Sequence, residues 1–276
     1  MSEYKILIFG SNGMLGNYLK SYLSQSYNII SLTRNDYDLS KLSIDGLTEL
    51  LTKNGITSND IVINCAGVIP QASKQRGLNT RLYFTINSLF PVILSQICDN
   101  MGAKMIHITT DCVFSGKDGS YDENSIHDEL NDYGMSKSLG ELCKATIIRT
   151  SIIGEEIINK RSLLEWVVSN RGNTINGYTN HMWNGVTCLQ LSKIIDEIVS
   201  KKLFWNGVRH VFSPRAVSKY ELVSMINDIY NLDITVQPFS ADDKVDKTIT
   251  SIRDPLFEIP DLNDQIISMR KYSIDV

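Results

Sequence analysis

The sequence predicts an α/β fold: a Rossmann-type, doubly wound parallel sheet with a smaller C-terminal lobe. Three observations predict this fold class. Short apolar runs alternate with longer segments of helical periodicity through the first 150 residues. The apolar runs are nearly continuous, as in strands that helices cover on both faces. A glycine-rich turn joins the first apolar run to the first helical segment.

The elements of the first half follow from these patterns in order. The run KILIF predicts a strand over 5–9, and apolar residues at helical spacing predict a helix over 14–23. The same reasoning gives strands and helices in alternation, and we expect Pro91 to bend the long helix because proline lacks an N–H. The further predicted elements are strand 28–33, helix 44–53, strand 60–64, helix 80–101, strand 104–110, helix 132–144 and strand 145–150.

The second half is less regular. We place a boundary near residue 155, so that 1–155 forms the sheet domain and 156–276 forms a smaller lobe partly interleaved with it. The lobe is expected to hold helices 162–170, 189–201 and 219–230 and a strand 209–212. Three prolines, at 238, 255 and 260, predict a loop-rich tail.

Composition excludes several classes of protein. The net charge of the 276 residues is −4 and no basic stripe occurs, so we expect no nucleic-acid partner. The sequence contains no run of 18 apolar residues, so we expect no membrane span. Its start lacks a signal-peptide pattern. The five cysteines are odd in number and form no Cys-x-x-Cys pair, which argues against disulfides and a metal site and favours the cytoplasm.

A glycine turn follows the first strand and opens the first helix. Gly10, Gly13 and Gly16 form a G-x-x-G-x-x-G pattern that Asn12, Met14 and Leu15 complete. The first glycine allows a tight turn, the second lets the backbone approach a pyrophosphate, and the third permits close packing of helix on strand. The pattern indicates a dinucleotide site at a helix N-terminus. A merely structural turn is the alternative.

The residue after the second strand bears on the adenosine end of a dinucleotide. Arg34 stands there and can hold a 2′-phosphate in a forked contact, which favours NADP(H). Asp36 nearby leaves NAD(H) open, because an acidic residue can bond the ribose 2′-hydroxyl. A solvated surface arginine is the alternative for Arg34.

A Y-x-x-x-K pattern lies at the start of the predicted helix 132–144. Lys137 is one helical turn from Tyr133, and its ammonium is expected to stabilise the phenolate and lower the pKa of Tyr133. Strand 104–110 ends in Thr109 and Thr110 at the ligand-binding edge of the sheet. We predict that the Thr110 hydroxyl polarises the same carbonyl oxygen that Tyr133 protonates, while Thr109 serves the strand.

Together these stretches resemble the extended short-chain dehydrogenase/reductases, in particular their dTDP-4-dehydrorhamnose reductase-like branch. The matching segments are 9–16, 62–67, 109–116, 131–141 and 148–151. The resemblance implies an NAD(P)H-dependent reduction of a nucleotide-linked 4-keto-6-deoxy sugar, with Thr110, Tyr133 and Lys137 as the catalytic set. It implies a substrate-binding role for the C-terminal lobe and a nucleotide sugar as partner.

The resemblance also implies which other residues line the site. Asp38 and Leu39 would flank the adenine, and Asn87 would lie behind the active site. Further residues expected in the cofactor cleft are Cys65, Ala66 and Gly67. Residues expected near the substrate are Val68, Asp111, Cys112, Ser151, His181 and Trp183.

Two departures from the family pattern affect the substrate side. Cys112 stands where the family usually has Tyr, and 68–70 replace an Ala-Tyr-Thr-like run. The segment 176–187 is longer than the family's substrate loop, and its His181 and Trp183 either contact the sugar or base or pack as a loop around a buried Trp. No base is evident beside Cys112, so we interpret it as a small pocket-lining residue. His107, His127 and His210 are interpreted as structural.

Other functions stay open at this point. One is an epimerase or dehydratase with a tightly bound cofactor, although dehydratases usually carry acidic residues after the catalytic Thr. Another is a non-catalytic regulatory homologue. The sequence does not decide the nucleotide, the sugar or the oligomeric state, for which a homodimer is one option.

Overall fold

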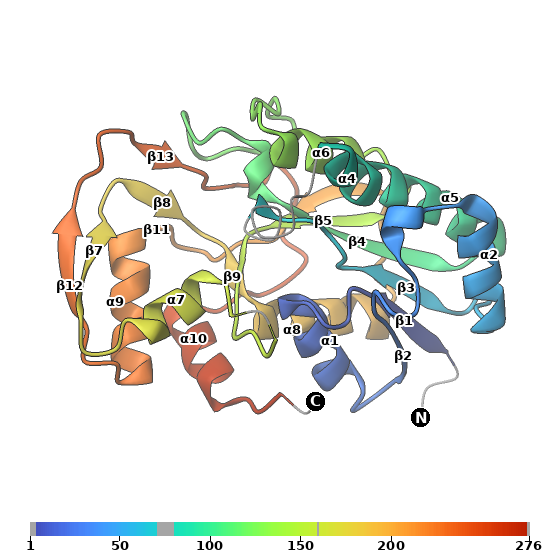
Figure 1. Ribbon diagram of the computed structural model, residues 1–276, viewed down its shortest axis with the longest axis horizontal. Coiled ribbons are helices and arrows are strands. Elements are labelled where there is room, and N and C mark those ends of the chain that lie inside the picture. The colour runs from blue at the N-terminus through green and yellow to red at the C-terminus, as the bar shows by residue number, and fades with distance from the viewer. Residues whose placement is uncertain (1–3, 71–79, 159, 275–276) are drawn as a thin grey trace.

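The computed structural model describes residues 4–70, 80–158 and 160–274 (Figure 1). Its strands are β1 Lys5–Phe9, β2 Asn28–Leu32, β3 Ile61–Asn64, β4 Lys104–Thr110, β5 Thr146–Thr150, β6 Ile152–Ile153, β7 Thr174–Tyr178, β8 His181–Trp183, β9 Val186–Thr187, β10 Gly207–His210, β11 Val217–Ser218, β12 Thr235–Phe239 and β13 Val245–Asp246. Its α-helices are α1 Met14–Leu23, α2 Ile44–Lys53, α4 Thr80–Tyr83, α5 Phe90–Met101, α6 Asp132–Gly140, α7 Leu163–Ser169, α8 Cys188–Ser200, α9 Lys219–Tyr230 and α10 Leu262–Lys271.

Six parallel strands form the central sheet in the order β10-β5-β4-β3-β1-β2. The predicted fold class is therefore confirmed. The chain builds outward from β1 to β2 and then crosses to β3 on the other side, so the strand order reverses between β1 and β3. Ligands of such sheets bind beyond the carboxyl ends of the strands at this reversal.

Helices cover both faces of the sheet, as the continuous apolar strands predict. Ile6 and Ile8 of β1 point into a core that includes α1 and α8, while Leu7 and Phe9 point into a second core with α2 and α5. The side chains of β1 alternate between these two cores because successive strand residues point to opposite faces. Figure 1 shows the sheet between these two helical layers.

The segment predicted as helix 80–101 is helical throughout. It is irregular before Pro91, and not at the proline as predicted. A π-helical stretch, Phe84–Leu89, separates α4 from α5, and Pro91 occupies the first turn of α5. The first turn of a helix tolerates a proline, because an N–H is not needed there. The wider π turn before it accommodates the hydrogen bond that Pro91 cannot donate. Asn87 lies within this π stretch.

The predicted helix 132–144 is too long, because α6 ends at Gly140. The next amides bond three residues back, from Glu141 to Ser138 and from Leu142 to Leu139, so the chain tightens into turns. The carboxylate of Glu141 accepts a hydrogen bond from Arg149 of β5, with Arg149 Nε 3.0 Å from Oε1. This tertiary bond has no signature in the local sequence.

The tail is more regular than predicted. Residues 235–239 form β12, residues 245–246 form β13, and residues 262–271 form the helix α10. Pro238 is accommodated because β12 pairs only with β7, so it is an edge strand on which a missing N–H costs little. The expectation of a loop-rich tail is therefore wrong for these three elements.

The C-terminal lobe is interleaved with the sheet domain. Helix α8 packs on α1, and β10 joins the main sheet beside β5. The lobe itself contains the three-stranded sheet β11-β8-β13 and the parallel pair β12-β7, on the left in Figure 1. One continuous hydrophobic core joins α1 and α8 to α7, α9 and α10.

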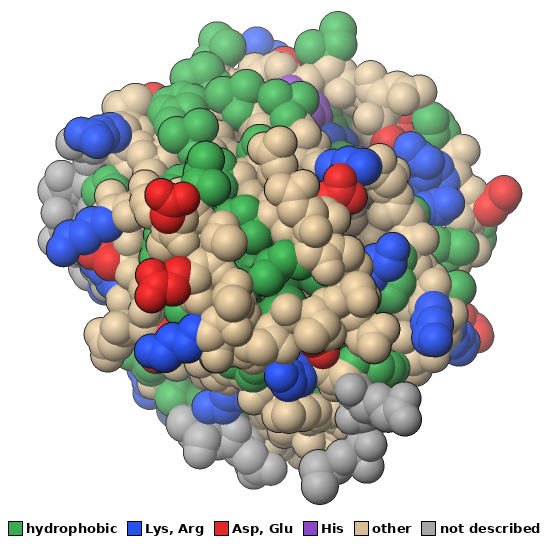
Figure 2. Space-filling view, turned by 90° about the vertical axis from the view of Figure 1, so that its right-hand side faces the viewer, with side chains coloured by type: hydrophobic (Ala, Val, Ile, Leu, Met, Phe, Trp, Pro, Cys, Tyr) green, Lys and Arg blue, Asp and Glu red, His purple; other side chains and the backbone are tan. Residues whose placement is uncertain are grey.

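The surface mixes charges of both signs. Figure 2 shows Lys and Arg side chains interspersed with Asp and Glu, and hydrophobic side chains gathered in the upper part of this face. Among the described residues, no helix is both long and apolar enough to cross a bilayer.

Candidate active site

The glycine turn after β1 meets the loop after β3 at the reversal of strand order. Gly10 has φ +80°, and a Cβ there would lie 2.8 Å from the Cα of Ala66. A Cβ on Gly16 would collide with the carbonyl oxygen of Gly10. Both positions therefore require glycine, because the backbones of β1, α1 and the 65–67 loop approach too closely for a side chain.

The first turn of α1 is left without a side-chain cap. Gly13 occupies the N-cap position and has no side chain to accept bonds from the first amides, and the first turn contains no acidic residue. Helices α2, α6, α7, α8, α9 and α10 all have a capping side chain. Asn12 and Gly13 are exposed. The amides at this end can thus bind an external anion, which the helix dipole also favours.

Arg34 and Asp38 lie at the carboxyl end of β2. The Arg34 side chain is 61% exposed, and its Nε lies 3.5 Å from Oδ1 of Asp38. Asp38 caps the short turn that starts at Leu39, and Asp36 accepts bonds from both the amide and the hydroxyl of Thr33 at 2.7 Å. Asp36 is thereby occupied within its own turn, while the guanidinium of Arg34 faces solvent.

Tyr133 and Thr110 come together where β4 ends and α6 begins. Asn131 caps α6 by accepting a bond from the Gly134 amide at 2.8 Å, and a Cβ on Gly134 would lie 2.7 Å from the carbonyl oxygen of Cys112. This close approach places the Tyr133 hydroxyl beside that of Thr110, whose hydrogen bond lowers the pKa of Tyr133 against the larger raising effect of burial. Thr109 is buried on the strand, with no partner for its hydroxyl among the described residues.

Lys137 lies one turn along α6 and points to the loop after β3. Only 7% exposed, it lies so close to Gly67 that a Cβ there would be 2.9 Å from its Nζ. Burial lowers the pKa of Lys137 to about 8, against the raising effects of Glu141 and Cys65. Within the described residues its Nζ has no ion pair and no hydrogen bond.

The expected lowering of the pKa of Tyr133 by Lys137 is not found. Burial dominates at both groups: it raises the pKa of the phenol and lowers that of the ammonium. The sequence spacing placed the two groups one turn apart, but it could not reveal how deeply the site withdraws them from water.

Asn87 ties the loop after β3 to α6. Its Oδ1 accepts a bond from the Val68 amide at 2.8 Å, and its Nδ2 donates to the Val68 carbonyl and to Oγ of Ser136, both at 3.0 Å. Asn87 thus lies behind Lys137, and it fixes the backbone that faces the ammonium. The three bonds satisfy its amide almost fully.

Asp111 and Cys112 follow Thr110 in a short 3₁₀ turn. Asp111 is 3% exposed, and burial raises the pKa of its carboxyl, which accepts bonds from the Thr110 hydroxyl at 3.1 Å and from the Cys112 thiol at 3.4 Å. Burial also raises the pKa of the Cys112 thiol to about 12. A thiol in this state is a poor nucleophile. Ser151 lies farther along and accepts a bond from the Val186 amide through its carbonyl.

One face of the small sheet β11-β8-β13 lies over this turn. Trp183 is paired with Val217 and His181 with Val245, so Trp183, His181, Lys219 and Lys247 share one face by the two-residue period of strands. A Cβ on Gly116 would touch the side chains of Val245 and Lys247 at 2.9 and 3.0 Å. The face therefore lies against the loop that continues from the 3₁₀ turn.

Lys219 and Lys247 were not predicted from the sequence. Both act electrostatically on Asp111 and Cys112 from the opposite lobe. Lys247 is paired with Glu129 at 3.3 Å, whereas Lys219 Nζ lies 4.9 Å from the centre of the Trp183 ring. One signal was present: a lysine at the first position of a helix opposes the helix dipole.

The two candidates in the 176–187 segment differ in their surroundings. Trp183 is 4% exposed and belongs to the core, with Lys219 on its ring. His181 is half-buried, stacks on Tyr178 with the ring centres 4.6 Å apart, and bonds the Asp243 carbonyl at 3.2 Å. Both belong to β8, where a loop was expected.

Arg149 is the centre of a buried polar cluster next to the site. Its guanidinium bonds both oxygens of Glu141 and also reaches His210 at 2.8 Å and His127 at 2.7 Å. Phe114 covers it, with the guanidinium carbon 5.1 Å from the ring centre. The cluster joins β5, β10 and the end of α6, which agrees with a structural part for the two histidines.

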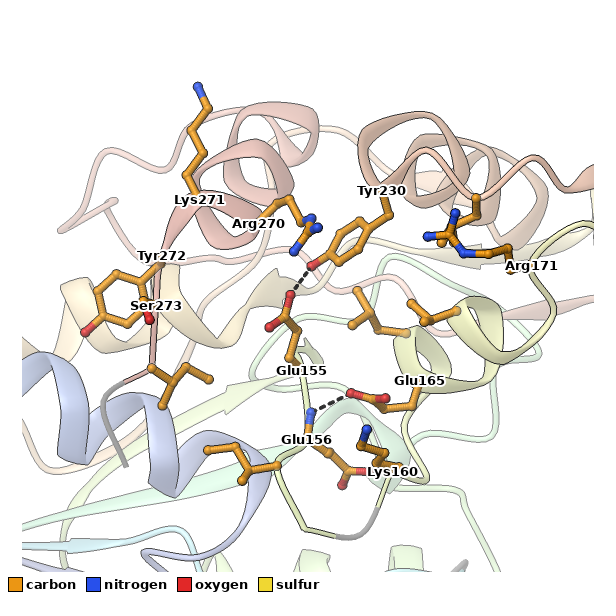
Figure 3. Close-up of a pocket in the computed structure, with 15 residues that line it drawn as sticks. Glu155, Glu156, Lys160, Glu165, Arg171, Tyr230, Arg270, Lys271, Tyr272 and Ser273 are labelled. Carbon is orange, nitrogen blue, oxygen red and sulfur yellow. Dashed lines mark hydrogen bonds between the residues drawn. The ribbon is translucent and has the colours of Figure 1, made fainter.

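A separate cavity of about 640 Å³ lies between α7, α9, α10 and the segment after β6 (Figure 3). Figure 3 shows Tyr230 bonded to Glu155, at 2.8 Å, and the Glu156 amide bonded to Glu165. Thr110, Tyr133 and Lys137 are not among its lining residues. This cavity is therefore distinct from the site at the end of β4.

Comparison with known proteins places the chain in a family. Residues 4–250 match the family model described as the RmlD substrate binding domain. The chain belongs to the RmlD substrate binding domain family. The expected resemblance is thus confirmed, and the match covers most of the chain.

Several members of the RmlD family are similar in sequence or structure. The dTDP-4-dehydrorhamnose reductase of Mycobacterium tuberculosis is 26% identical over 53% of this chain and 49% of that protein, so the chain spans about half the length of this relative. The spore coat polysaccharide biosynthesis protein SpsK of Bacillus subtilis is 27% identical over 88% of this chain and 86% of that protein. The dTDP-4-dehydrorhamnose reductase of Bacillus anthracis, solved in complex with NADP, superposes with a TM-score of 0.80 at 22% identity over 98% of this chain and 99% of that one.

Proposed function

We propose that this RmlD-family chain is an NADP(H)-dependent reductase of a nucleotide-linked 4-keto-6-deoxy sugar, as the names of its relatives suggest. The observation that carries the proposal is the meeting of the Tyr133 and Thr110 hydroxyls at the carboxyl end of β4, with the buried Lys137 ammonium one turn behind. Two hydroxyls at one point can bond a single carbonyl oxygen.

The residues at the reversal of strand order fit a nicotinamide dinucleotide. The uncapped amides of α1 suit a pyrophosphate, and the glycines at 10, 13 and 16 admit the backbone of the turn to it. Arg34, with its exposed guanidinium, suits a 2′-phosphate and so NADP(H), while Asp36 is occupied by Thr33. The other residues proposed to line this cleft are Asn12, Met14, Leu15, Asp38, Leu39, Cys65, Ala66, Gly67 and Asn87.

The mechanism follows from the protonation states in the site. The bound dinucleotide supplies the hydride. Because burial raises the pKa of Tyr133, its phenol is protonated at neutral pH and is ready to give a proton to the oxygen of the substrate as charge develops there. The Thr110 hydroxyl donates its one proton to Asp111 at 3.1 Å in the structure; turned toward the substrate, it would donate a second hydrogen bond to that oxygen and stabilise the same charge.

Lys137 has the part of a positioning cation. Its Nζ lies beside Gly67 without a partner among the described residues, so its donors are available to the ribose hydroxyls of the dinucleotide. Its ammonium lies one helical turn from Tyr133, although burial and not this charge sets the pKa of the phenol. Asn87 holds the loop in place behind it.

The experiment that tests the proposal compares Tyr133→Phe with the unchanged protein. We expect NADPH oxidation with a panel of 4-keto-6-deoxy sugar nucleotides to fall about 10²- to 10⁴-fold in the variant, because the proton donor is lost. The affinity for NADPH, measured by fluorescence titration, should change little. Turnover close to that of the unchanged protein would reject the assignment of Tyr133.

The same assay separates the rival functions. A reductase consumes NADPH in proportion to product, whereas an epimerase, a dehydratase or a regulatory homologue shows no net consumption. Cys112, a neutral thiol after Asp111, takes the place where dehydratases carry an acid, which favours the reductase.

Two further proposals concern the setting of the reaction. We propose the cytoplasm, because all five cysteines are free thiols and a reducing compartment preserves them. We also propose a homodimer, because Met135 and Leu139 of α6, and Leu142 just after this helix, are exposed large apolar side chains.

A further inference from the structure

Lys219 is a half-buried cation of the C-terminal lobe. It begins α9, and within the described residues its ammonium has no ion pair and no hydrogen bond. It lies on the ring of Trp183, 4.9 Å from the ring centre. Withdrawing an ammonium from water without hydrogen bonds is unfavourable, so such a group indicates a ligand.

The direction of Lys219 is set by the sheet that carries it. It directly follows β11, whose Val217 pairs with Trp183, and its ammonium lies over the Trp183 ring, so it is on the same side of the small sheet as that ring. Its charge acts on Asp111 and Cys112, the two residues that follow Thr110, although it forms no ion pair with the Asp111 carboxylate. The ammonium is therefore near the turn that follows Thr110 without being bonded to it.

A neighbouring cation provides a contrast. Lys247 lies on the same face and also acts on Asp111, but Glu129 neutralises it at 3.3 Å. Among the described residues of this face, Lys219 therefore has no carboxylate partner, whereas Lys247 has one. On the same lobe, His181 of β8 stacks on Tyr178, the last residue of β7, with ring centres 4.6 Å apart. The turn that follows Thr110 thus faces a cation, and aromatic rings lie on the same lobe.

We propose that Lys219 binds the diphosphate of the nucleotide sugar, with Trp183 as the platform that positions its ammonium. This inference rests on the proposed function and names the group that orients the substrate. In a nucleotide sugar the diphosphate lies next to the sugar, so a cation that faces the turn after Thr110 is placed to bind it while the sugar carbonyl meets the Thr110 and Tyr133 hydroxyls. The phosphate oxygens accept hydrogen bonds from the ammonium, which has none among the described residues. Such charge-assisted bonds are strong.

The test measures binding without turnover. Isothermal titration with dTDP, dTMP and thymidine compares the unchanged protein with Lys219→Met, Lys219→Arg and the control Lys244→Met, whose lysine is exposed on the same lobe. We expect Lys219→Met to weaken dTDP binding tenfold or more and thymidine binding little, because one charge-assisted contact is lost. Lys219→Arg should restore part of the affinity, and Lys244→Met should change nothing.

Three outcomes overturn the inference. One is unchanged dTDP affinity in Lys219→Met, and another is an equal loss for thymidine, which would indicate a general distortion of the lobe. A parallel loss of NADPH affinity would instead assign Lys219 to the cofactor. Failure of the proposed function is seen separately: the protein would then bind dTDP through Lys219 yet oxidise no NADPH with any keto sugar.

Discussion

At the scale of single residues, the site holds charges at a cost to stability. Lys137 is buried without an ion pair or hydrogen bond among the described residues, and Asp111 is buried with only weak donors. Arg149 is also buried but is fully paired, since its guanidinium bonds Glu141 and two histidines. A buried charge that the protein leaves unsatisfied is a mark of function, because stability alone would remove it.

Replacing Lys137 should make the protein more stable while abolishing activity. The pKa of Lys137 is about 8 in the fold and about 10.5 in an unfolded chain, so below pH 8 the fold carries the cost of a charged, buried ammonium. Lys137→Met removes that cost, and we expect its free energy of unfolding at pH 7 to exceed that of the unchanged protein by about 1–3 kcal/mol.

The sign of the pH dependence gives a second check on this variant. Between pH 8 and 10.5 the unfolded chain holds a proton that the fold has released, so the unchanged protein gains stability and the advantage of Lys137→Met shrinks. Urea unfolding at pH 7 and pH 10 measures both values. Lys144→Met, an exposed lysine, is the control, and a destabilised Lys137→Met at pH 7 would contradict the expectation.

At the scale of elements, two irregular features build the cofactor cleft. The glycine turn lets the backbones of β1, α1 and the 65–67 loop approach closely, and the π stretch Phe84–Leu89 carries Asn87 to that loop. Both features interrupt regular helix or strand geometry, and both make contacts that fix the loops at the carboxyl end of the sheet. Single π turns are frequent at functional sites for this reason.

Gly16→Ala should disturb the packing of α1 against the glycine turn. The new Cβ would collide with the Gly10 carbonyl, so α1 must move from β1, and we expect a loss of about 1–3 kcal/mol in unfolding free energy with weaker NADPH binding. Urea unfolding and fluorescence titration measure the two effects. Glu49→Ala in α2 is the control, because this side chain is exposed. An unchanged affinity for NADPH in Gly16→Ala would refute the role of this packing.

At the scale of the whole molecule, the two lobes share one core, and the proposed active site lies where they meet. The core of α1 and α8 continues into α7, α9 and α10, so the lobe with Lys219 is held firmly against the sheet. On another side of the molecule, α6 and its flanks leave large apolar side chains in solvent. These are Leu89, Ile126, Leu130, Met135, Leu139 and Leu142.

The proposed homodimer can be tested on this surface. Figure 1 shows α6 in the upper part of the molecule. Leu142 is 75% exposed, and we expect Leu142→Glu to shift the protein from dimer to monomer in sedimentation equilibrium, since a charge cannot be buried there cheaply. Ile44→Glu, on the exposed face of α2, should leave the dimer intact. A monomeric unchanged protein would exclude the dimer.

The sequence alone determined the elements whose pattern is local. The alternation of apolar strands and amphipathic helices, the glycine turn and the Tyr133–Lys137 spacing are read directly from residues close together in the chain. They predict the fold class and most helix and strand ends within one or two residues, because hydrophobic periodicity and chain geometry depend on neighbours.

Only the tertiary structure decided the features that join distant residues. The end of α6 depends on Arg149, eight residues beyond Glu141, and the strand at 235–239 depends on its partner at 174–178. The raised pKa of Tyr133 and the partnerless Lys219 depend on burial by parts of the chain far from them. Burial and charge are properties of packed surroundings, which a single stretch of sequence does not contain.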